Sequence, residues 1–371
     1  MTTPLPAQRA HPAMSRGLTL VANGQFDWAE TASGELSPDE VMIQVVGCGV
    51  CHTDIGFAYE GISTRHALPL ILGHEIAGRV VLAGEQAGTW IGRSVIVPAV
   101  IPCGNCDSCR SGRPTICRKQ FMPGNDADGG FANHVRVPAR GLCPVPEELP
   151  KGLTLAMLSV VADAVTTPYE AIRRSGLSAD DVAVFVGAGG IGGFGVQIAA
   201  ALGAAVVAID VDADRLDLAS AHGATLALNA RECADVKSAV RSFARQSGRH
   251  GIGLKIFETS GTATGQQTAF SLLDPGAHLA IVGYTAQKVE VRLSNLMAFD
   301  ATARGNWGCP PAQYPNALAM VLEGKIHIQP FVEMHPLEEA QQVLEAVHHH
   351  QLRRRAVLVP QSRGIEQGTK P

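Results

Sequence analysis

The sequence lacks several features that would place it in a large functional class. It has no run of about 18 or more apolar residues, so we expect no membrane-spanning helix. The formal net charge is only -4, which offers no basic excess for nucleic acid or an anionic membrane. Residues 1–16 have neither the charged start nor the apolar stretch of a secretion signal. We therefore expect a cytoplasmic protein whose partners are small molecules, and neither nucleic acid nor a membrane.

The length and the cysteine content narrow the fold. The 371 residues, 46% of them hydrophobic, are too many for one core and favour two domains. The chain has nine cysteines, and this odd number, without a secretion signal, argues against a disulfide framework. Four of the cysteines lie between residues 103 and 117, which indicates a metal site instead.

These four cysteines are spaced as ligands of one metal ion. Four thiolates in one loop leave no coordination position for a substrate, which is typical of a structural zinc site. An iron–sulfur cluster is the alternative, but the sequence has no other redox-centre signal, and disulfides are not expected in a reducing compartment. The expected ligands are Cys103, Cys106, Cys109 and Cys117.

A second set of metal ligands lies between residues 46 and 78. Cys51 supplies a thiolate, His74 an imidazole and Glu75 a carboxylate, all of which zinc accepts. Packing is a poor explanation for a Cys-His-Thr-Asp run that is followed at this distance by Gly-His-Glu. We therefore expect a catalytic metal at these residues.

Three further polar residues are candidates for this site. Thr53 can hydrogen-bond a substrate oxygen, and Asp54 can orient the ligating imidazole. Residues 155–174 have the apolar spacing of a helix that joins two domains, and Asp163 lies within that apolar pattern. A carboxylate there needs a positive partner. A metal ion would supply it, and so would a helix cap or an ordinary salt bridge.

The residues around these ligands form short β-like runs. Four such runs, at 41–46, 78–82, 94–97 and 132–137, are separated by Gly and Pro. Regular turn signals of this kind predict a β-rich, barrel-like domain. Residues 1–17 have no periodicity, and we expect them to lie loosely on the surface.

After residue 181 the pattern changes to alternating strands and helices. A strand at 182–186 leads into Gly-x-Gly-x-x-Gly, then a helix at 194–202 and a strand at 205–209. In this context the glycines let the backbone approach a diphosphate at a helix N-terminus. Asp210 can bind ribose hydroxyls and repel a 2′-phosphate, so NAD is expected rather than NADP. The expected cofactor contacts are Gly187, Gly189, Gly190, Ile191, Gly192 and Asp210, while Arg215 is either an adenosine-ribose contact or an ordinary surface charge.

The alternation continues with strands at 225–228, 254–258 and 278–282 and helices at 234–246 and 264–273. Repeated units of this length predict a parallel, doubly wound sheet. The last strand leads into Val282 and Tyr284 at the edge where such sheets bind ligands. We expect this backbone to face the nicotinamide.

The C-terminal part holds two basic clusters. Amphipathic stretches at 317–323 and 337–347 come first, and a β-like run at 356–359 comes last. Three consecutive histidines, 348–350, point in different directions on a helix and cannot converge on a metal, so we expect a solvated face. Of Arg353, Arg354 and Arg355, at least one is expected to reach a phosphate of the cofactor or the substrate.

Together these motifs resemble the zinc-containing medium-chain alcohol dehydrogenases. The resemblance covers residues 17–360 and rests on four motifs in the family's order: Cys-His-Thr-Asp, Gly-His-Glu-Ile-Ala-Gly followed by Gly84, the cysteine lobe and the nucleotide fingerprint. It implies an α/β chain in which a doubly wound Rossmann domain is inserted into a GroES-like catalytic domain. The implied division is 1–164 for the catalytic domain with a zinc lobe at 100–120, 165–306 for the NAD-binding domain, and 307–371 for the return to the catalytic domain.

The resemblance also implies roles for single residues. The family's third protein ligand lies four residues before a threonine, here Thr167, so Asp163 completes the metal set and Glu75 becomes a fourth ligand or a neighbouring carboxylate. His52 falls where the family places a basic side chain on the cofactor diphosphate, and Thr167 is also expected to contact the cofactor. Gly56 replaces the histidine that passes the proton to solvent in several relatives.

The family implies zinc- and NAD-dependent oxidation of an alcohol, two zinc ions per subunit, and a homodimer or homotetramer. Residues 121–131 resemble 6-hydroxycyclohex-1-ene-1-carbonyl-CoA dehydrogenases of anaerobic benzoyl-CoA degradation, which implies a CoA thioester substrate that is oxidised to the 6-oxo product. Two alternatives remain open. One is a dehydrogenase for a simple secondary, aryl or polyol alcohol, and the other is a non-catalytic zinc- and nucleotide-binding protein.

Overall fold

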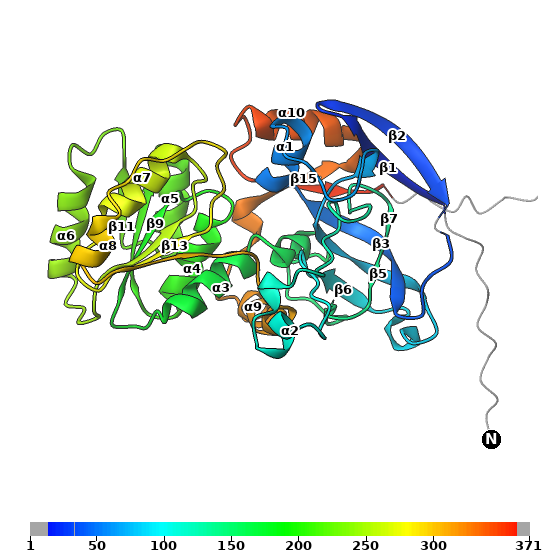
Figure 1. Cartoon of the computed structure of the whole chain (residues 1–371), viewed down its shortest axis with the longest axis horizontal. Helices are drawn as coiled ribbons and strands as arrows, with labels where there is room; N and C mark the ends of the chain where they lie inside the picture. The colour runs from blue at the N-terminus through cyan, green and yellow to red at the C-terminus, as the bar shows by residue number, and fades with distance from the viewer. Residues whose placement is uncertain (1–13, 33, 362–371) are drawn as a thin grey trace, which may run out of the picture.

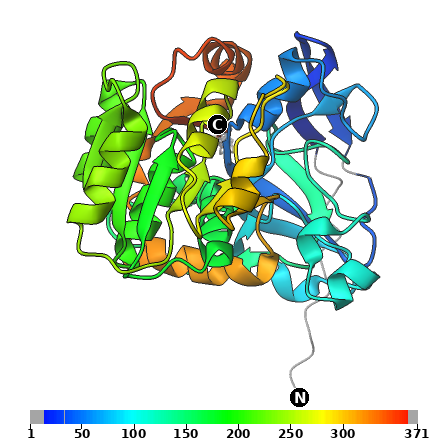
Figure 2. The same ribbon diagram turned by 60° about the vertical axis from the view of Figure 1, so that its left-hand side comes forward.

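A computed structural model describes residues 14–32 and 34–361. The chain forms two lobes side by side, one built on a mixed sheet and the other on a parallel sheet covered by helices (Figure 1). Figure 2 shows the C-terminal part, in orange and red, lying against both lobes. The predicted combination of a GroES-like part and a doubly wound Rossmann part is confirmed. The domain boundaries at 164 and 306 stay predictions.

The β-rich lobe contains two sheets. In the larger sheet β3 is buried along most of its length, because its neighbours and the smaller sheet cover it. The smaller sheet has the order β2-β1-β4, with β1 (Met14–Ala22), β2 (Gln25–Ala32) and β4 (Leu70–Ile71). The larger has the order β15-β16-β3-β5-β6-β8, with β7 paired to β3: β3 (Glu40–Gly49), β5 (Glu75–Ala83), β6 (Ser94–Val97), β7 (His134–Pro138), β8 (Cys143–Pro144), β15 (Val332–Pro336) and β16 (Arg355–Val359).

The second lobe is a six-stranded parallel sheet with the order β11-β10-β9-β12-β13-β14. The strand order reverses between β9 and β12, and such sheets bind ligands at this point beyond the carboxyl ends of the strands. The central strand β9 is apolar and buried on both faces, as expected for a strand covered by helices on two sides. The strands are β9 (Val182–Val186), β10 (Ala205–Asp210), β11 (Leu226–Asn229), β12 (Lys255–Glu258), β13 (His278–Ile281) and β14 (Thr302–Gly305).

Helices surround both sheets. The helices with more than one turn are α1 (His52–Tyr59), α3 (Thr166–Ser175), α4 (Gly192–Ala201), α5 (Ala213–Ala221), α6 (Val236–Gln246), α7 (Ala263–Ser271), α8 (Ser294–Ala298), α9 (Tyr314–Leu322) and α10 (Ala340–His348). Within the described residues, no helix combines the length and the apolar character that crossing a membrane requires.

One predicted helix is wrong. Residues 155–174 do not form one continuous helix, because a 3₁₀ segment, Met157–Ala162, ends before Asp163 and α3 begins at Thr166. Asp163 has a backbone conformation outside the helical region (φ -142°, ψ -57°). The apolar spacing continues across this break because both segments pack into the same core. The break turns the Asp163 carboxylate out of the helical pattern and toward residues of the β-rich lobe.

Candidate metal centres and dinucleotide site

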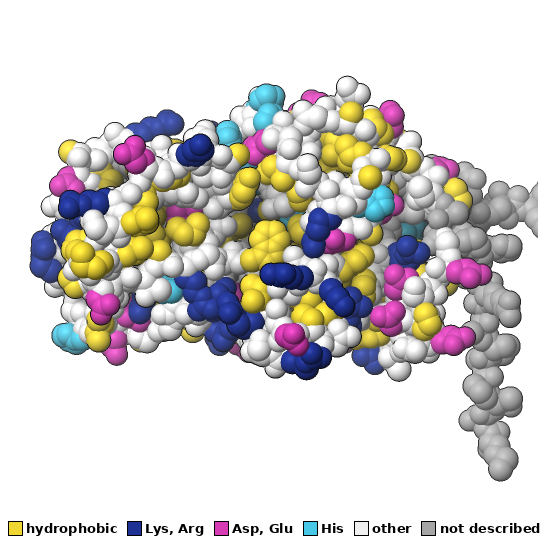
Figure 3. All heavy atoms as spheres, in the orientation of Figure 1, with side chains coloured by type: hydrophobic (Ala, Val, Ile, Leu, Met, Phe, Trp, Pro, Cys, Tyr) yellow, Lys and Arg dark blue, Asp and Glu magenta, His cyan; other side chains and the backbone are white. Residues whose placement is uncertain are grey.

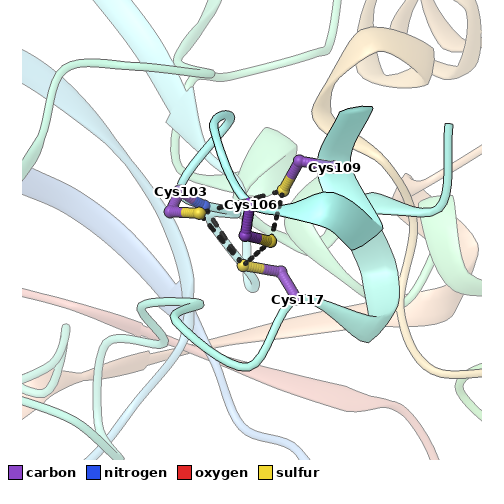
Figure 4. A group of neighbouring side chains, drawn as sticks. All are labelled: Cys103, Cys106, Cys109 and Cys117. Atoms are coloured by element: carbon purple, nitrogen blue, oxygen red, sulfur yellow. Dashed lines mark hydrogen bonds between the residues drawn. The ribbon is translucent and has the colours of Figure 1, made fainter. Parts of the chain in front are cut away.

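The four clustered cysteines converge in space (Figure 4). Their sulfurs are 3.5 Å apart for Cys103–Cys117 and Cys106–Cys109, 3.7 Å for Cys106–Cys117 and 4.0 Å for Cys103–Cys109. A tetrahedral zinc with bonds of about 2.3 Å places its sulfurs about 3.8 Å apart. An iron–sulfur cluster puts several atoms between its cysteine sulfurs and needs a wider cage, and a disulfide needs about 2.0 Å. The donor set therefore fits one closed zinc site.

The second group consists of Cys51, His74, Glu75 and Asp163, whose ligand atoms all lie within 4.8 Å of one another. The Asp163 Oδ2 atom is 3.6 Å from Cys51 Sγ and 3.7 Å from His74 Nε2. Zinc bonds of about 2.0–2.3 Å place neighbouring ligand atoms about 3.3–3.8 Å apart in a tetrahedron. Burial opposes the charge of Asp163, but His74 outweighs it and lowers the Asp163 pKa to about 2. An ionised carboxylate is the form that a metal binds.

Asp54 fixes the orientation of the ligating imidazole. Its Oδ1 atom is 3.2 Å from His74 Nδ1, so the Nε2 atom faces the metal group. The same carboxylate accepts hydrogen bonds from the backbone N–H groups of Cys51 and Gly73 at 2.9 and 3.2 Å. This one buried side chain thus connects the segment that carries Cys51 to the segment that carries His74, and it orients the His74 ring.

Both carboxylate oxygens of Glu75 accept hydrogen bonds from groups outside the metal group. Arg355 Nε donates to Glu75 Oε2 at 2.7 Å, Arg355 Nη2 donates to Oε1, and the Ala164 N–H donates to Oε1 at 3.0 Å. Burial opposes the charge of the guanidinium, but Glu75 raises the Arg355 pKa above its usual value. The structure therefore places Glu75 beside the metal group as an engaged carboxylate. Whether it also ligates the metal stays a prediction.

Arg353, Arg354 and Arg355 do not act as one cluster, and the prediction that at least one of them reaches a phosphate stays a prediction. Arg355 is buried against Glu75, and Arg353 forms an ion pair with Asp214. The three side chains separate because β16 begins at Arg355 and alternates its side chains between two faces.

Thr53 lies at the metal group, since its hydroxyl oxygen is 3.7 Å from Cys51 Sγ. Thr167 also faces it, because its hydroxyl donates a hydrogen bond to Asp163 Oδ1. Gly56 lies on the buried side of α1, and a Cβ atom there would be 2.6 Å from the Ile62 side chain. A histidine at this position would require Ile62 to move.

Residues 187–192, the Gly-x-Gly-x-x-Gly segment, form a loop that we call the cradle. Its close backbone contacts leave no room for a side chain at Gly187 or Gly192. Gly187 has a φ of 99°, in the region that favours glycine, and a Cβ on Gly192 would overlap the Gly187 carbonyl oxygen. Asp210 lies beside the cradle, where its Oδ2 accepts a hydrogen bond from the Ala188 N–H at 2.7 Å and its Oδ1 accepts one from the Val211 N–H at 2.7 Å. The Gly189, Gly190 and Ile191 backbone completes this loop before α4. These contacts fit a dinucleotide diphosphate and ribose.

Basic side chains surround this cradle. A Cβ on Gly189 would be 3.6 Å from Arg215 Nη1, and one on Gly190 would be 3.0 Å from Arg355 Nη1. His52, the first residue of α1, lies near both arginines, whose charges, after burial, lower its pKa to about 4. The structure thus places Arg215, His52 and Arg355 around one loop, and their contact with the cofactor stays a prediction.

Val282 and Tyr284 follow β13 at the carboxyl edge of the sheet. The Val282 N–H donates to the Glu258 carbonyl oxygen at 3.0 Å, and the Tyr284 side chain is 63% exposed. The three histidines at 348–350 are more varied than predicted. His349 and His350 reach solvent, whereas His348 stacks on Tyr59 with ring centroids 4.7 Å apart.

Comparison with known proteins agrees with this geometry. Residues 37–147 match the family model of the alcohol dehydrogenase GroES-like domain, and residues 190–323 match that of zinc-binding dehydrogenases. An uncharacterized zinc-type alcohol dehydrogenase-like protein from Haemophilus influenzae is 31% identical over 296 residues, which are 79% of this chain and 83% of the relative. The chain belongs to the zinc-dependent alcohol dehydrogenase family. It is therefore an oxidoreductase of that family.

Two further alcohol dehydrogenase-type proteins are similar to this chain over most of its length. An alcohol dehydrogenase from Geobacillus stearothermophilus is 29% identical over 331 residues, covering 89% of this chain and 94% of the relative. The crystal structure of a zinc-binding dehydrogenase from Sinorhizobium meliloti, bound to NADP, superposes with a TM-score of 0.80 at 26% identity, covering 94% of this chain and 100% of that one. The two lobes and their connection are thus those of the family.

Proposed function

We propose that the protein oxidises a secondary alcohol to a ketone with zinc and NAD. The observation that carries this proposal is the convergence of Cys51, His74 and Asp163 just before α3. The parallel sheet that follows α3 in the chain has the glycine cradle at its carboxyl edge. When bound, zinc supplies a Lewis acid for the substrate hydroxyl, and NAD supplies a hydride acceptor.

The side chains of this site divide the remaining work. Cys51, His74 and Asp163 hold the metal. Thr53 relays the hydroxyl proton of the substrate toward solvent as the carbon loses hydride to NAD, so the alcohol loses one proton and one hydride ion. The cradle and its basic neighbours bind the diphosphate. Asp210 accepts hydrogen bonds from the ribose and disfavours a 2′-phosphate.

The experiment is NADH formation from a panel of secondary alcohols by the zinc-loaded protein. Thr53→Ser retains the hydroxyl and should keep most of the turnover, whereas Thr53→Ala should lower kcat by about 10²-fold or more, as expected for a lost general base. The non-catalytic alternative would be favoured if the protein binds zinc and NADH in binding experiments but forms no NADH from any alcohol of the panel.

For the substrate, we propose a cyclic β-hydroxyacyl-CoA, 6-hydroxycyclohex-1-ene-1-carbonyl-CoA, whose ring alcohol gives a conjugated ketone on oxidation. The resemblance of residues 121–131 motivates this choice. A hydroxyl that is both allylic and β to a thioester is an activated substrate for hydride removal. The alternative is a simple secondary, aryl or polyol alcohol.

A group of arginines is the candidate contact for the phosphates of such a thioester. Arg174 ends α3 with only 16% of its side chain exposed, and its pKa is lowered by burial and then by the charge of Arg304. The charge of Arg113, in the cysteine lobe, also lowers the Arg174 pKa. The Glu170 carboxylate, 4.0 Å from Arg174 Nε, offsets only part of this positive charge. Figure 3 shows Lys and Arg side chains gathered near α3. Helix α3 begins beside the metal group, and its 10 residues, at about 1.5 Å per residue, place its C-terminal end about 15 Å away from that group.

Two measurements test the thioester proposal. The value of kcat/KM for the CoA thioester should exceed those for the free hydroxy acid and for cyclohexenol by about 10²-fold or more, because remote binding energy contributes to the transition state. Arg304→Gln should lower it about tenfold for the thioester only, whereas Arg245→Gln on α6 should change nothing. Rates within a few fold across the three substrates would leave the simple alcohol as the better assignment.

We further propose a homodimer or homotetramer in the cytoplasm with small-molecule partners only. Sedimentation of the zinc-loaded protein would test the assembly, and a monomer at micromolar concentration would contradict it.

A further inference from the structure

The segment between α10 and β16 has an unusual backbone. His350 has a φ of 55°, in the left-handed region, which few residues other than glycine occupy and in which Asn, Asp and His are the most frequent of these. Two hydrogen bonds fix the turn: the His350 N–H donates to the Val347 carbonyl oxygen at 3.0 Å, and the Gln351 N–H donates to that of Ala346 at 2.8 Å. A glycine would adopt this conformation without strain, so the imidazole at this position needs a reason.

The imidazole of His350 lies over that of His52. Their ring centroids are 6.0 Å apart and the ring planes differ by 23°. His52 in turn lies within the field of Arg215 and Arg355, the two arginines beside the glycine cradle.

The same segment is tied to the other lobe. Arg353 forms an ion pair with Asp214, which lies in the first turn of α5, next to Arg215. The segment therefore runs from the β-rich lobe, past the cradle, to the start of α5. It crosses the place where the diphosphate of a dinucleotide would lie.

We propose that His350 is a cofactor-binding residue and that the segment 350–354 closes over the cofactor diphosphate as a clasp. This inference rests on the proposed NAD dependence. Glu75 engages Nε and Nη2 of Arg355, while Arg355 Nη1 lies beside Gly190 and Arg215 Nη1 beside Gly189. With the His52 and His350 rings next to them, these groups can donate hydrogen bonds to one diphosphate. The ring pair places His350 beside His52, and the exposed Arg353–Asp214 pair connects the segment to the start of α5.

The test uses two substitutions that suit a left-handed backbone, His350→Gly and His350→Asn. Binding of NADH to the zinc-loaded protein is measured by fluorescence titration, and thermal unfolding is measured in parallel. We expect Kd to rise about tenfold in both variants with an unchanged or higher Tm, because the fold loses strain and only the ligand loses a contact. ADP-ribose should lose affinity by the same factor, since it carries the diphosphate without the nicotinamide.

The neighbouring His349→Asn is the matched control, because His349 is exposed just before this segment and its ring lies against His348, tilted by 52°, and not over His52. Its Kd should stay within about twofold of wild type. Unchanged NADH affinity in both His350 variants, or an equal loss in His349→Asn, would overturn the clasp alone. Failure of the wild-type protein to bind NADH would overturn the proposed NAD dependence together with the clasp.

Discussion

Arg355 and Glu75 form a buried ion pair across 280 residues of sequence, with Arg355 Nε 2.7 Å from Glu75 Oε2. The side chains are 5% and 0% exposed, so neither charge can turn to water if the other is removed. We predict that Arg355→Leu lowers the free energy of unfolding by about 3–5 kcal/mol, since an uncompensated buried carboxylate remains.

The double variant Arg355→Leu/Glu75→Gln should recover part of that loss. Arg353→Leu is the control, because its ion pair with Asp214 is exposed and should contribute less than about 1 kcal/mol. Urea unfolding of the four proteins measures this. Equal losses for Arg353→Leu and Arg355→Leu would show that the buried pair has no special role.

A second prediction concerns Asp54, which holds the His74 imidazole at 3.2 Å. Asp54→Ala should weaken zinc binding at the catalytic group by about 10–100-fold, because the imidazole loses the partner that orients it. Chelator competition gives the affinity. The cysteine lobe is the internal control, since its zinc should keep its affinity, and a loss of both zinc ions would indicate misfolding instead.

A third prediction concerns cofactor choice. Asp210→Gly combined with Val211→Arg should shift preference from NAD toward NADP by removing the carboxylate that repels the 2′-phosphate. The N–H groups of Ala188 and Val211 lose their acceptor in this variant, so some loss of thermal stability should accompany the shift. Faster wild-type turnover with NADP than with NAD at equal concentration is the result that disproves the assignment.

A fourth prediction concerns the cradle. Gly192→Ala should destabilise the fold by about 1–3 kcal/mol and weaken NADH binding, because the added methyl group overlaps the Gly187 carbonyl oxygen. Gly88→Ala is the control, since a Cβ there meets nothing within 4 Å. If both variants bound NADH equally well, the loop would not be the close-approach site proposed here.

Local patterns in the sequence were sufficient for much of the Rossmann lobe and for the metal ligands. The strand at 182–186 and the one at 205–210 follow from apolar runs that end at turn signals. The four cysteines could be assigned to one metal site because they are close together in the sequence. The break before Asp163 was missed because both flanking segments share one apolar spacing. The helix that begins at His52 was missed because its hydrophobic positions have no one-sided pattern.

Other relationships depend on the fold itself. The pairing of Arg355 with Glu75 and the stacking of His350 on His52 join positions some 280–298 residues apart, which no local spacing can indicate. The left-handed backbone of His350 also has no signal in a sequence where glycine would be the expected residue.

The most direct test of the account is zinc content together with NADH formation in three proteins: wild type, Cys51→Ser and Cys106→Ser. We predict about two zinc ions per chain in wild type, about one in Cys51→Ser with a folded chain and no turnover, and a sharp loss of thermal stability in Cys106→Ser. The account would be contradicted by a Cys51→Ser protein that keeps both zinc ions and full turnover, or by one that unfolds while Cys106→Ser remains stable and active.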